Sequence, residues 1–285
     1  MTFEFGIIAA LFAMLFWGVG DFLIQRSARR IGDLESLAII GIVGSIGILP
    51  FIFSEIQQIS LGTLYFLIFV GIFTFIVSIA NYEALKRGKL SVIDVILCIE
   101  LPITVVLGLF LFQEKISMIQ FAAIAVIFLG VLLISFKRSG KSKGVEKGVL
   151  LALVVAVGYA FMNYLTALGS RNISPLMIIW FPWFVFSLIS LVIISKNRGI
   201  RKFYTDVRRL KYFVITIGVI DTIAWVSYSV ALNTSQLSIT TAITESYPAI
   251  ALFLGYWFNK ERLSNYQFTG AFITILASLA LAFII

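Results

Sequence analysis

Long apolar runs alternate with short polar connections along the whole chain. Ten of these runs approach the roughly 20 residues that a helix needs to cross a bilayer. They are residues 5–25, 37–53, 61–85, 90–112, 119–136, 148–168, 175–195, 212–232, 238–258 and 266–285. The pattern therefore predicts an all-α polytopic membrane protein with ten transmembrane helices.

One segment of the chain is present twice. Leu90-Ser91, Gly108 and Glu114-Lys115 recur as Leu237-Ser238, Gly255 and Glu261-Arg262 at one constant offset. Two tandem units of five helices each must insert with opposite orientation, because five is an odd number of crossings, and this is the inverted-repeat architecture of many secondary transporters. We expect a first repeat at residues 1–138, a basic linker at 139–147 and a second repeat at 148–285.

Each copy of the repeated segment also carries a glutamate near a proline: Glu100 with Pro102, and Glu245 with Pro248. Proline removes a backbone hydrogen bond from a helix, so we expect helix breaks here, with a plain kink as the alternative. The glutamates do not keep the common offset, because Glu245 aligns with Cys98. Since two helical positions subtend about 200°, one glutamate is expected to face a cavity and the other a seam between helices.

The composition agrees with a membrane protein. The chain is 60% hydrophobic and 13% charged, with a mean hydropathy of +1.05, whereas about a quarter of a soluble domain is charged. The net charge of +8 comes from Lys and Arg in the polar connections, so we expect contact with lipid headgroups and no nucleic-acid partner. The single cysteine, Cys98, excludes an intramolecular disulfide.

The distribution of Lys and Arg predicts the orientation. Nearly all of them follow the first, third, fifth, seventh and ninth runs, whereas the side that carries both termini has only Lys115 and Arg171. The positive-inside rule places the basic side in the cytoplasm. We therefore expect a multi-pass protein of the cell (plasma) membrane with both termini outside the cytoplasm.

Ionisable side chains inside spans are costly, so each is a functional candidate. Those of this chain are Asp21, Glu83, Asp94, Glu100, Asp221 and Glu245, all acidic, and the chain has no His. An anionic substrate would need a buried Arg or Lys, so a cationic or zwitterionic small molecule fits better. Because burial favours the protonated carboxyl, Glu100 and Glu245 are candidates for proton coupling; glutamates that only hydrogen-bond between helices are the alternative. We expect no metal and no cofactor.

Polar and aromatic side chains follow single faces of several predicted helices. The candidates for substrate binding are Trp17, Asn81, Tyr159, Asn163, Asp221, Trp225, Tyr228 and Glu245. Asp221, Trp225 and Tyr228 share one face by their spacing, and aromatic rings can contact a cation. Helix packing through interhelical hydrogen bonds is the alternative. Glu83, Glu114 and Glu261 lie beside basic residues at helix ends, where we expect solvated side chains and weak ion pairs.

Three short motifs give the chain a resemblance to the EamA family of the drug/metabolite transporter superfamily. They are Phe16-Trp17-Gly18, Tyr82-Glu83-Ala84-Leu85 and Gln113-Glu114-Lys115, and the resemblance covers nearly the whole chain. It implies carriers of small metabolites, often amino-acid exporters, with a central cavity and with both termini in the cytoplasm, opposite to the charge distribution. The first helix is also similar to that of the small multidrug-resistance branch, but Trp17 stands where that branch has its essential glutamate.

These observations favour a secondary carrier that exports amino acids or amines by alternating access, with proton coupling through intramembrane carboxylates. A small multidrug-type exporter of lipophilic cations and a lipid-linked sugar flippase are the alternatives. A membrane-embedded enzyme is not expected, because the sequence has no nucleophile elbow, no P-loop and no metal-ligand spacing. The expected partners are a small-molecule substrate and the lipid bilayer, for a monomer or a homodimer.

Overall fold

The computed structural model describes residues 2–87, 90–135, 147–197, 199–260 and 263–284, and every regular element in these ranges is a helix. The helices are α1 (Thr2–Ile31), α2 (Asp33–Ile56), α3 (Leu61–Arg87), α4 (Leu90–Leu97), α5 (Glu100–Leu111), α6 (Met118–Ser135), α7 (Lys147–Asn172), α8 (Met177–Asn197), α9 (Ile200–Arg209), α10 (Lys211–Thr234), α11 (Leu237–Thr244), α12 (Tyr247–Asn259) and α13 (Asn265–Phe283). The linker expected at residues 139–147 lies outside the described residues, except for Lys147, which begins α7.

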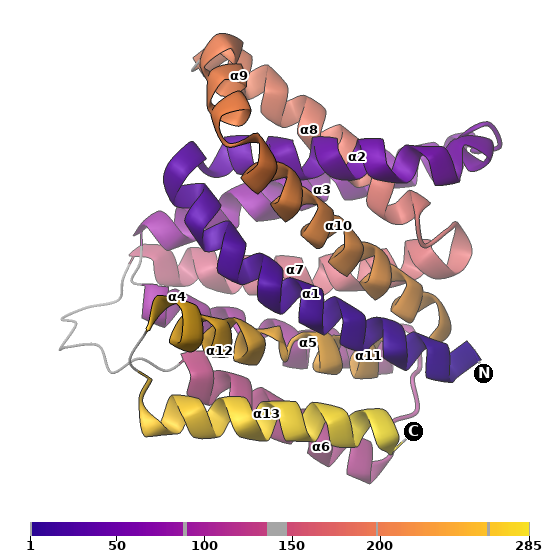
Figure 1. Ribbon diagram of the computed structural model, residues 1–285. Coiled ribbons are helices and arrows are strands. Elements are labelled where there is room, and N and C mark those ends of the chain that lie inside the picture. The colour runs from indigo at the N-terminus through magenta and orange to yellow at the C-terminus, as the bar shows by residue number, and fades with distance from the viewer. Residues whose placement is uncertain (1, 88–89, 136–146, 198, 261–262, 285) are drawn as a thin grey trace.

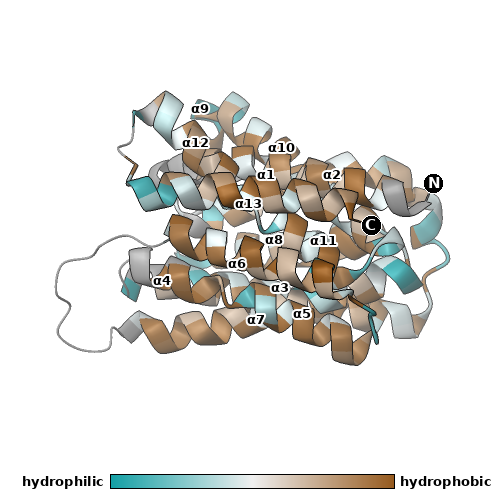
Figure 2. Cartoon of the chain, turned by 90° about the horizontal axis from the view of Figure 1, so that it is seen from below, coloured by the Kyte–Doolittle hydropathy of each residue, from teal (hydrophilic) through white to brown (hydrophobic). Residues whose placement is uncertain are grey.

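Eight stretches of the described residues are long and apolar enough to cross a membrane. They are Leu34–Ile56, Leu61–Ala84, Met118–Ser135, Gly148–Asn172, Met177–Asn197, Lys211–Thr234, Leu237–Phe258 and Asn265–Phe283. The first and fourth predicted spans contain shorter apolar stretches, Phe5–Gly20 and Val95–Leu111. Figure 2 shows hydrophobic residues along the helices and hydrophilic ones mostly toward their ends. The chain is therefore a multi-pass membrane protein that is helical throughout its described elements.

The fourth and ninth predicted spans are each broken into two helices. The turn between α4 and α5 is at residues 98–99, and the turn between α11 and α12 is at residues 245–246. These turns are equivalent in the sequence repeat. Pro102 and Pro248 lie in the first turns of α5 and α12, where a missing N–H leaves no hydrogen bond unmade within the helix. Each proline therefore stabilises the start of the second half-helix.

The first helix of each half packs against helices of the other half. α1 of the first half packs against α10, α11 and α12 of the second, and α7 of the second half packs against α3, α4 and α5 of the first. α2 pairs with α8, and α6 pairs with α13. Figure 1 shows α1 and α10 side by side. The same contacts therefore occur twice with the halves exchanged, as inverted repeats require.

Two glycines at equivalent positions of the repeat permit close crossings between the halves. A Cβ built on Gly71 of α3 would lie 2.8 Å from the Cβ of Val185 on α8. A Cβ built on Gly218 of α10 would lie 2.7 Å from the Cβ of Val43 on α2. Because real Cβ atoms do not approach so closely, each position requires glycine for the observed packing.

The start of α1 and the end of α13 lie at the same end of the helix bundle, which we call the terminal face (Figure 1). The end of α10 is at this face too, since Gly6 lies against Thr234 and Ser235. The opposite end, where α8 ends and α10 begins, is called the basic face.

α9 is a helix that the hydropathy pattern did not predict. It lies at the basic face in the connection between the seventh and eighth predicted spans. Phe203, Val207 and Leu210 pack with Ile39 and Val214 of α2 and α10, while the basic residues of α9 are exposed. A short helix with an apolar stripe and a basic remainder is typical of the membrane interface. The expectation of a simple polar connection is therefore wrong here.

Candidate substrate site at the two helix breaks

Glu100 and Glu245 lie at the breaks of the two interrupted helices, whose halves α5 and α11 pack together. Glu100 is the first residue of α5, and Glu245 lies in the turn between α11 and α12. Each is surrounded by protein and keeps some accessible surface, and the charge of Glu245 acts on Glu100. The two acids, for which the sequence predicts a cavity-facing and a seam-facing position, thus lie one at each helix break and within range of each other's charge.

Asn163 of α7 fixes the Glu100 carboxylate. Its Nδ2 donates to Glu100 Oε1 at 2.8 Å and lies 3.4 Å from the hydroxyl of Thr104. Asn163 is buried, and α7 belongs to the other half of the chain from α5. One carboxylate of the pair is therefore held by a hydrogen bond that crosses the interface between the halves.

Tyr159 and Asn81 extend this polar region toward α3. Tyr159 lies one turn before Asn163 on α7, hydrogen-bonds Asn81, and is within range of the charges of Glu100 and Glu245. The Oδ1 atom of Asn81 is buried and has no hydrogen-bond partner among the described residues. An acceptor in this position is suited to an N–H or O–H donor of a bound molecule.

Four aromatic rings from α1, α10 and α12 form a cluster around Trp17. The ring centroid of Trp17 is 5.0 Å from those of Trp225 and Tyr228 and 6.2 Å from that of Tyr247. Tyr247 begins α12, directly after the turn that contains Glu245. Tyr228 is fully buried, shares a 2.9 Å hydrogen bond with the Thr241 hydroxyl, and is within range of both acid charges. Aromatic faces next to carboxylates are suited to a cation.

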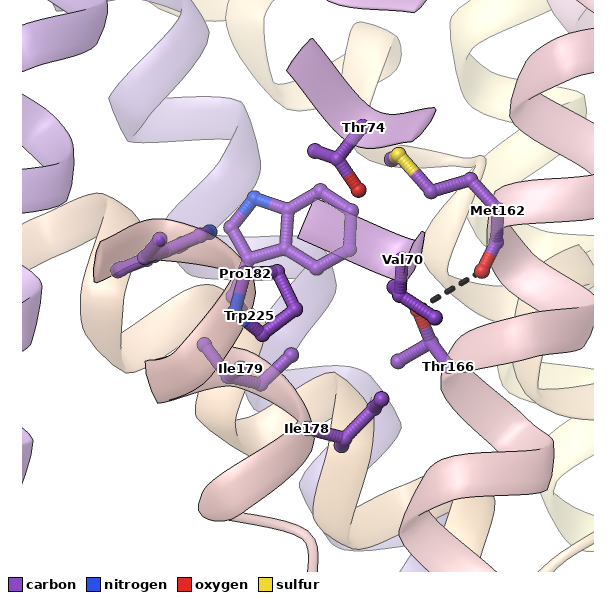
Figure 3. A pocket seen from close by; sticks show the side chains of 9 residues that line it. Val70, Thr74, Met162, Thr166, Ile178, Ile179, Pro182 and Trp225 are labelled. Atoms are coloured by element: carbon purple, nitrogen blue, oxygen red, sulfur yellow. Dashed lines mark hydrogen bonds between the residues drawn. The ribbon is translucent and has the colours of Figure 1, made fainter. Parts of the chain in front are cut away.

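Trp225 also lines a small cavity between α3, α7, α8 and α10. Its other lining residues are Val70, Thr74, Met162, Thr166, Ile178, Ile179, Pro182 and Trp183. Figure 3 shows Trp225 and Thr74 on one side and Met162 and Thr166 on the other, with the Thr166 hydroxyl donating to the Met162 carbonyl at 2.8 Å. Because the lining is mostly apolar, this space favours a hydrocarbon group over a charge.

The structure places two of the other four expected intramembrane acids, Asp221 and Glu83. Asp221 is buried one turn before Trp225, and neither Glu100 nor Glu245 is among the groups that act on it. Glu83 is exposed and pairs with Arg87 at 2.7 Å, as expected for a helix end. The side chains of Asp21 and Asp94 lie outside the described residues. Of the predicted stripe on α10, Trp225 and Tyr228 contact Trp17, and Tyr228 is within range of both acid charges.

Glu114 is a buried residue that sequence reasoning assigned wrongly to a solvated helix end. Its side chain is 4% exposed and lies 3.5 Å from the guanidinium of Arg171. The carboxylate accepts hydrogen bonds from the first residues of α11. The available signal in the sequence was that Leu-Ser and Glu recur at one offset. The offset alone does not reveal that Glu114 of the first copy contacts Leu237-Ser238 of the second copy. Glu261 lies outside the described residues.

The comparisons with known proteins agree with this architecture. Residues 4–136 and 146–283 each match the family model described as the EamA-like transporter family. A crystal structure that is described only as that of a protein superposes with a TM-score of 0.80 over 98% of this chain and 96% of its own chain. At 13% identity, this likeness concerns the fold alone. No curated protein matches the chain.

Proposed function

The chain belongs to the EamA-like transporter family and is a membrane transporter, and from this premise we propose that it carries small cationic or zwitterionic metabolites. Amines and amino acids are the simplest substrates of this kind. The proposed mechanism is alternating access, most simply export, driven by protons that bind to Glu100 or Glu245. The observation that carries the proposal is the pair of carboxylates at the two helix breaks, within range of Tyr228, whose ring packs with those of Trp17 and Trp225.

The charges of the site support this substrate class. Two neighbouring carboxylates repel each other when both are ionised, so a proton or a substrate cation between them is strongly stabilising. The described residues of the site include no Lys or Arg side chain within hydrogen-bond distance of Glu100 or Glu245. A phosphorylated or sulfated substrate would meet like charge here and is disfavoured.

The arrangement of the halves supports alternating access. We propose ten spans, with the shorter apolar stretches of α1 and of α4–α5 completing the eight longer ones and with residues 1–138 and 148–285 as the repeats. Rocking of one inverted repeat against the other would expose a central site to each face in turn. The excess of Lys and Arg at the basic face supports a cytoplasmic location for that face in the cell membrane. A C-terminal reporter that is active only in the cytoplasm would contradict this orientation by giving a signal.

The experiment that tests the function is transport in proteoliposomes. Labelled amino acids, amines and phosphorylated compounds are offered with and without a proton gradient to wild type, Glu245→Gln, Glu100→Gln and the control Glu83→Gln. We expect Glu245→Gln to lose gradient-driven transport, and Glu83→Gln to keep it because that side chain is exposed and outside the site. Unchanged coupled flux in Glu245→Gln would remove Glu245 from the mechanism, and efficient transport of phosphorylated compounds would overturn the substrate class.

A second candidate function is export of lipophilic cations. The apolar cavity that shares Trp225 with the aromatic cluster favours it, because an organic cation with a hydrocarbon group could occupy both. A lipophilic cation is therefore included in the same assay. Competition of that cation with an amine substrate would place both in one site, whereas transport of the cation alone would favour the second candidate.

A further inference from the structure

The carboxylate of Glu114 joins the two halves at the terminal face. Glu114 follows α5 in the first half, and it accepts hydrogen bonds from the N-terminus of α11 in the second half. The backbone N–H groups of Leu237 and Ser238 donate at 2.5 Å and 3.0 Å, and the Ser238 hydroxyl donates at 2.7 Å. A carboxylate at a helix N-terminus is stabilised by the unpaired N–H groups and by the helix dipole.

Arg171, at the end of α7, covers the same carboxylate. Its guanidinium lies 3.5 Å from Glu114 and donates to the carbonyl oxygens of Leu232 and Ser235 at 3.0 Å and 2.8 Å. It also lies 4.2 Å from the ring centroid of Phe112 in the first half. These bonds hold the ends of α7 and α10 against the end of α5. We call Glu114, Arg171 and Leu237-Ser238 the terminal latch.

A glycine allows the latch to form. A Cβ built on Gly108 of α5 would lie 2.5 Å from Ser238 Oγ and 2.5 Å from Glu114 Oε2. Any other residue at position 108 would therefore displace the Glu114 carboxylate or the Ser238 hydroxyl from this contact. α5 and α11 pack together, whereas the equivalent helices α12 and α4 are not among the helix pairs with extensive contact in the described part of the chain. The described residues of α5 and α11 thus hold the two halves against each other at the terminal face.

The latch consists of the elements that keep one offset in the sequence repeat. Leu237-Ser238 come from the second copy, and Gly108 and Glu114 come from the first. The repeat also contains a second set of the same residue types, in which Leu90-Ser91 come from the first copy and Gly255 and Glu261 come from the second. A static cap would require only one of these two sets. Two faces that close alternately would require both.

We propose that Glu114 is a positioning residue that holds the terminal face closed, and that its release from the N-terminus of α11 opens this face during transport. α11 is a single helix of eight residues between the latch and the turn that contains Glu245. Movement of its N-terminus therefore moves Glu245. This inference rests on the proposed transport function, and it adds the device that would connect the acid pair to one face of the membrane.

Accessibility of a cysteine tests the latch without any substrate. In a Cys98→Ala chain, a reporter is placed by Val105→Cys, since Val105 is buried on α5 and its carbonyl lies 3.5 Å from Ser238 Oγ. An impermeant thiol reagent is added to one side of oriented proteoliposomes at a time. Labelling rates are compared for Glu114→Gln, for Ser238→Ala, which removes a single donor, and for the control Lys115→Gln, whose side chain is exposed.

We expect Glu114→Gln to raise labelling from the terminal side by about tenfold, the factor that corresponds to one charge-assisted hydrogen bond, with no rise from the basic side. Ser238→Ala is expected to have a smaller effect of the same sign, and Lys115→Gln none. Equal rises from both sides would indicate general loosening and overturn the proposal, as would unchanged labelling in both Glu114→Gln and Ser238→Ala.

The sequence equivalent Glu261 provides a matched variant. Glu261→Gln is expected to leave labelling from the terminal side at or below the rate of the parent chain, and a rise equal to that of Glu114→Gln would contradict the proposal. Because labelling requires no substrate, absence of transport would refute the proposed function without affecting this result. Normal coupled transport together with unchanged labelling would refute the latch alone.

Discussion

The two interface glycines give the most quantitative test of the inverted arrangement. Replacing Gly218 with Ala places a Cβ 2.7 Å from Val43 Cβ and 2.8 Å from its Cγ1. Carbon atoms in contact prefer about 3.5–4.0 Å, so the new atom is too close by roughly 0.7–1.3 Å on these values. Overpacking of this kind costs about 1–3 kcal/mol. We expect Gly218→Ala to lower the free energy of unfolding by that amount.

Gly71, the sequence equivalent of Gly218, lies close to backbone as well as to a side chain. A Cβ on Gly71 would lie 2.8 Å from Val185 Cβ and 3.1 Å from the backbone Cα of Pro182. The clash at Gly218 involves only the side chain of Val43 among its nearest atoms. Val43→Gly should therefore relieve most of the cost of Gly218→Ala, whereas Val185→Gly should relieve only part of the cost of Gly71→Ala, because backbone cannot be removed.

The assay is a double-mutant cycle on each pair, with the free energy of unfolding measured by denaturant titration in mixed micelles. The Gly218–Val43 coupling is expected to be about 1–3 kcal/mol and favourable in the double variant. The control is Gly47→Ala on α2, where no atom lies within 4 Å of the new Cβ and where Ala is expected to stabilise the helix by about 0.5–1 kcal/mol. A neutral or stabilising Gly218→Ala, or a coupling near zero, would refute the close crossing.

Two further substitutions test the site. Asn163→Leu removes the donor to Glu100 without changing the acids. Because an interhelical hydrogen bond is worth about 0.6–1.7 kcal/mol in membranes, we expect a loss of about 3- to 18-fold in coupled transport rate. An unchanged rate would show that Glu100 needs no partner. Trp225→Leu removes one ring face, so the KM for a cationic substrate should rise by about 2- to 30-fold, from 0.5–2 kcal/mol per cation–π contact. An equal rise for a neutral substrate would contradict the cation–π role.

Much of the fold can be predicted from the sequence because its causes are local. Apolar runs of sufficient length become helices in a bilayer, where every backbone group must be hydrogen-bonded internally. The prolines at 102 and 248 place the two breaks, and the repeated segment relates the two halves. α9 was not predicted because its apolar residues Phe203 and Val207, with Leu210 directly after it, are few and lie within a basic segment. The average hydropathy of that segment is therefore low.

The site was less predictable because it depends on contacts between the copies. Asn163, Trp17 and Tyr228 were found as polar or aromatic residues on apolar helices, but the sequence did not show which of them meet. Asp221 satisfied the same criterion, and the structure shows it as a buried residue one turn before Trp225. Periodicity identifies which residues share a face of a helix. Which faces meet at the centre depends on the packing of α1 against the second half and of α7 against the first.

The two glutamates show why an imperfect repeat still yields one site. Glu100 aligns with Tyr247, and Glu245 aligns with Cys98, so neither acid is the symmetry equivalent of the other. In an inverted repeat, however, the two helix breaks lie close to the axis that relates the halves, and side chains from either break reach the same region. Equivalence by sequence is therefore unnecessary for a shared proton or cation. Sequence equivalence is necessary where one copy must form at one membrane face the contacts that the other copy forms at the opposite face. The Leu-Ser, Gly and Glu elements of the terminal latch are the ones that keep the common offset.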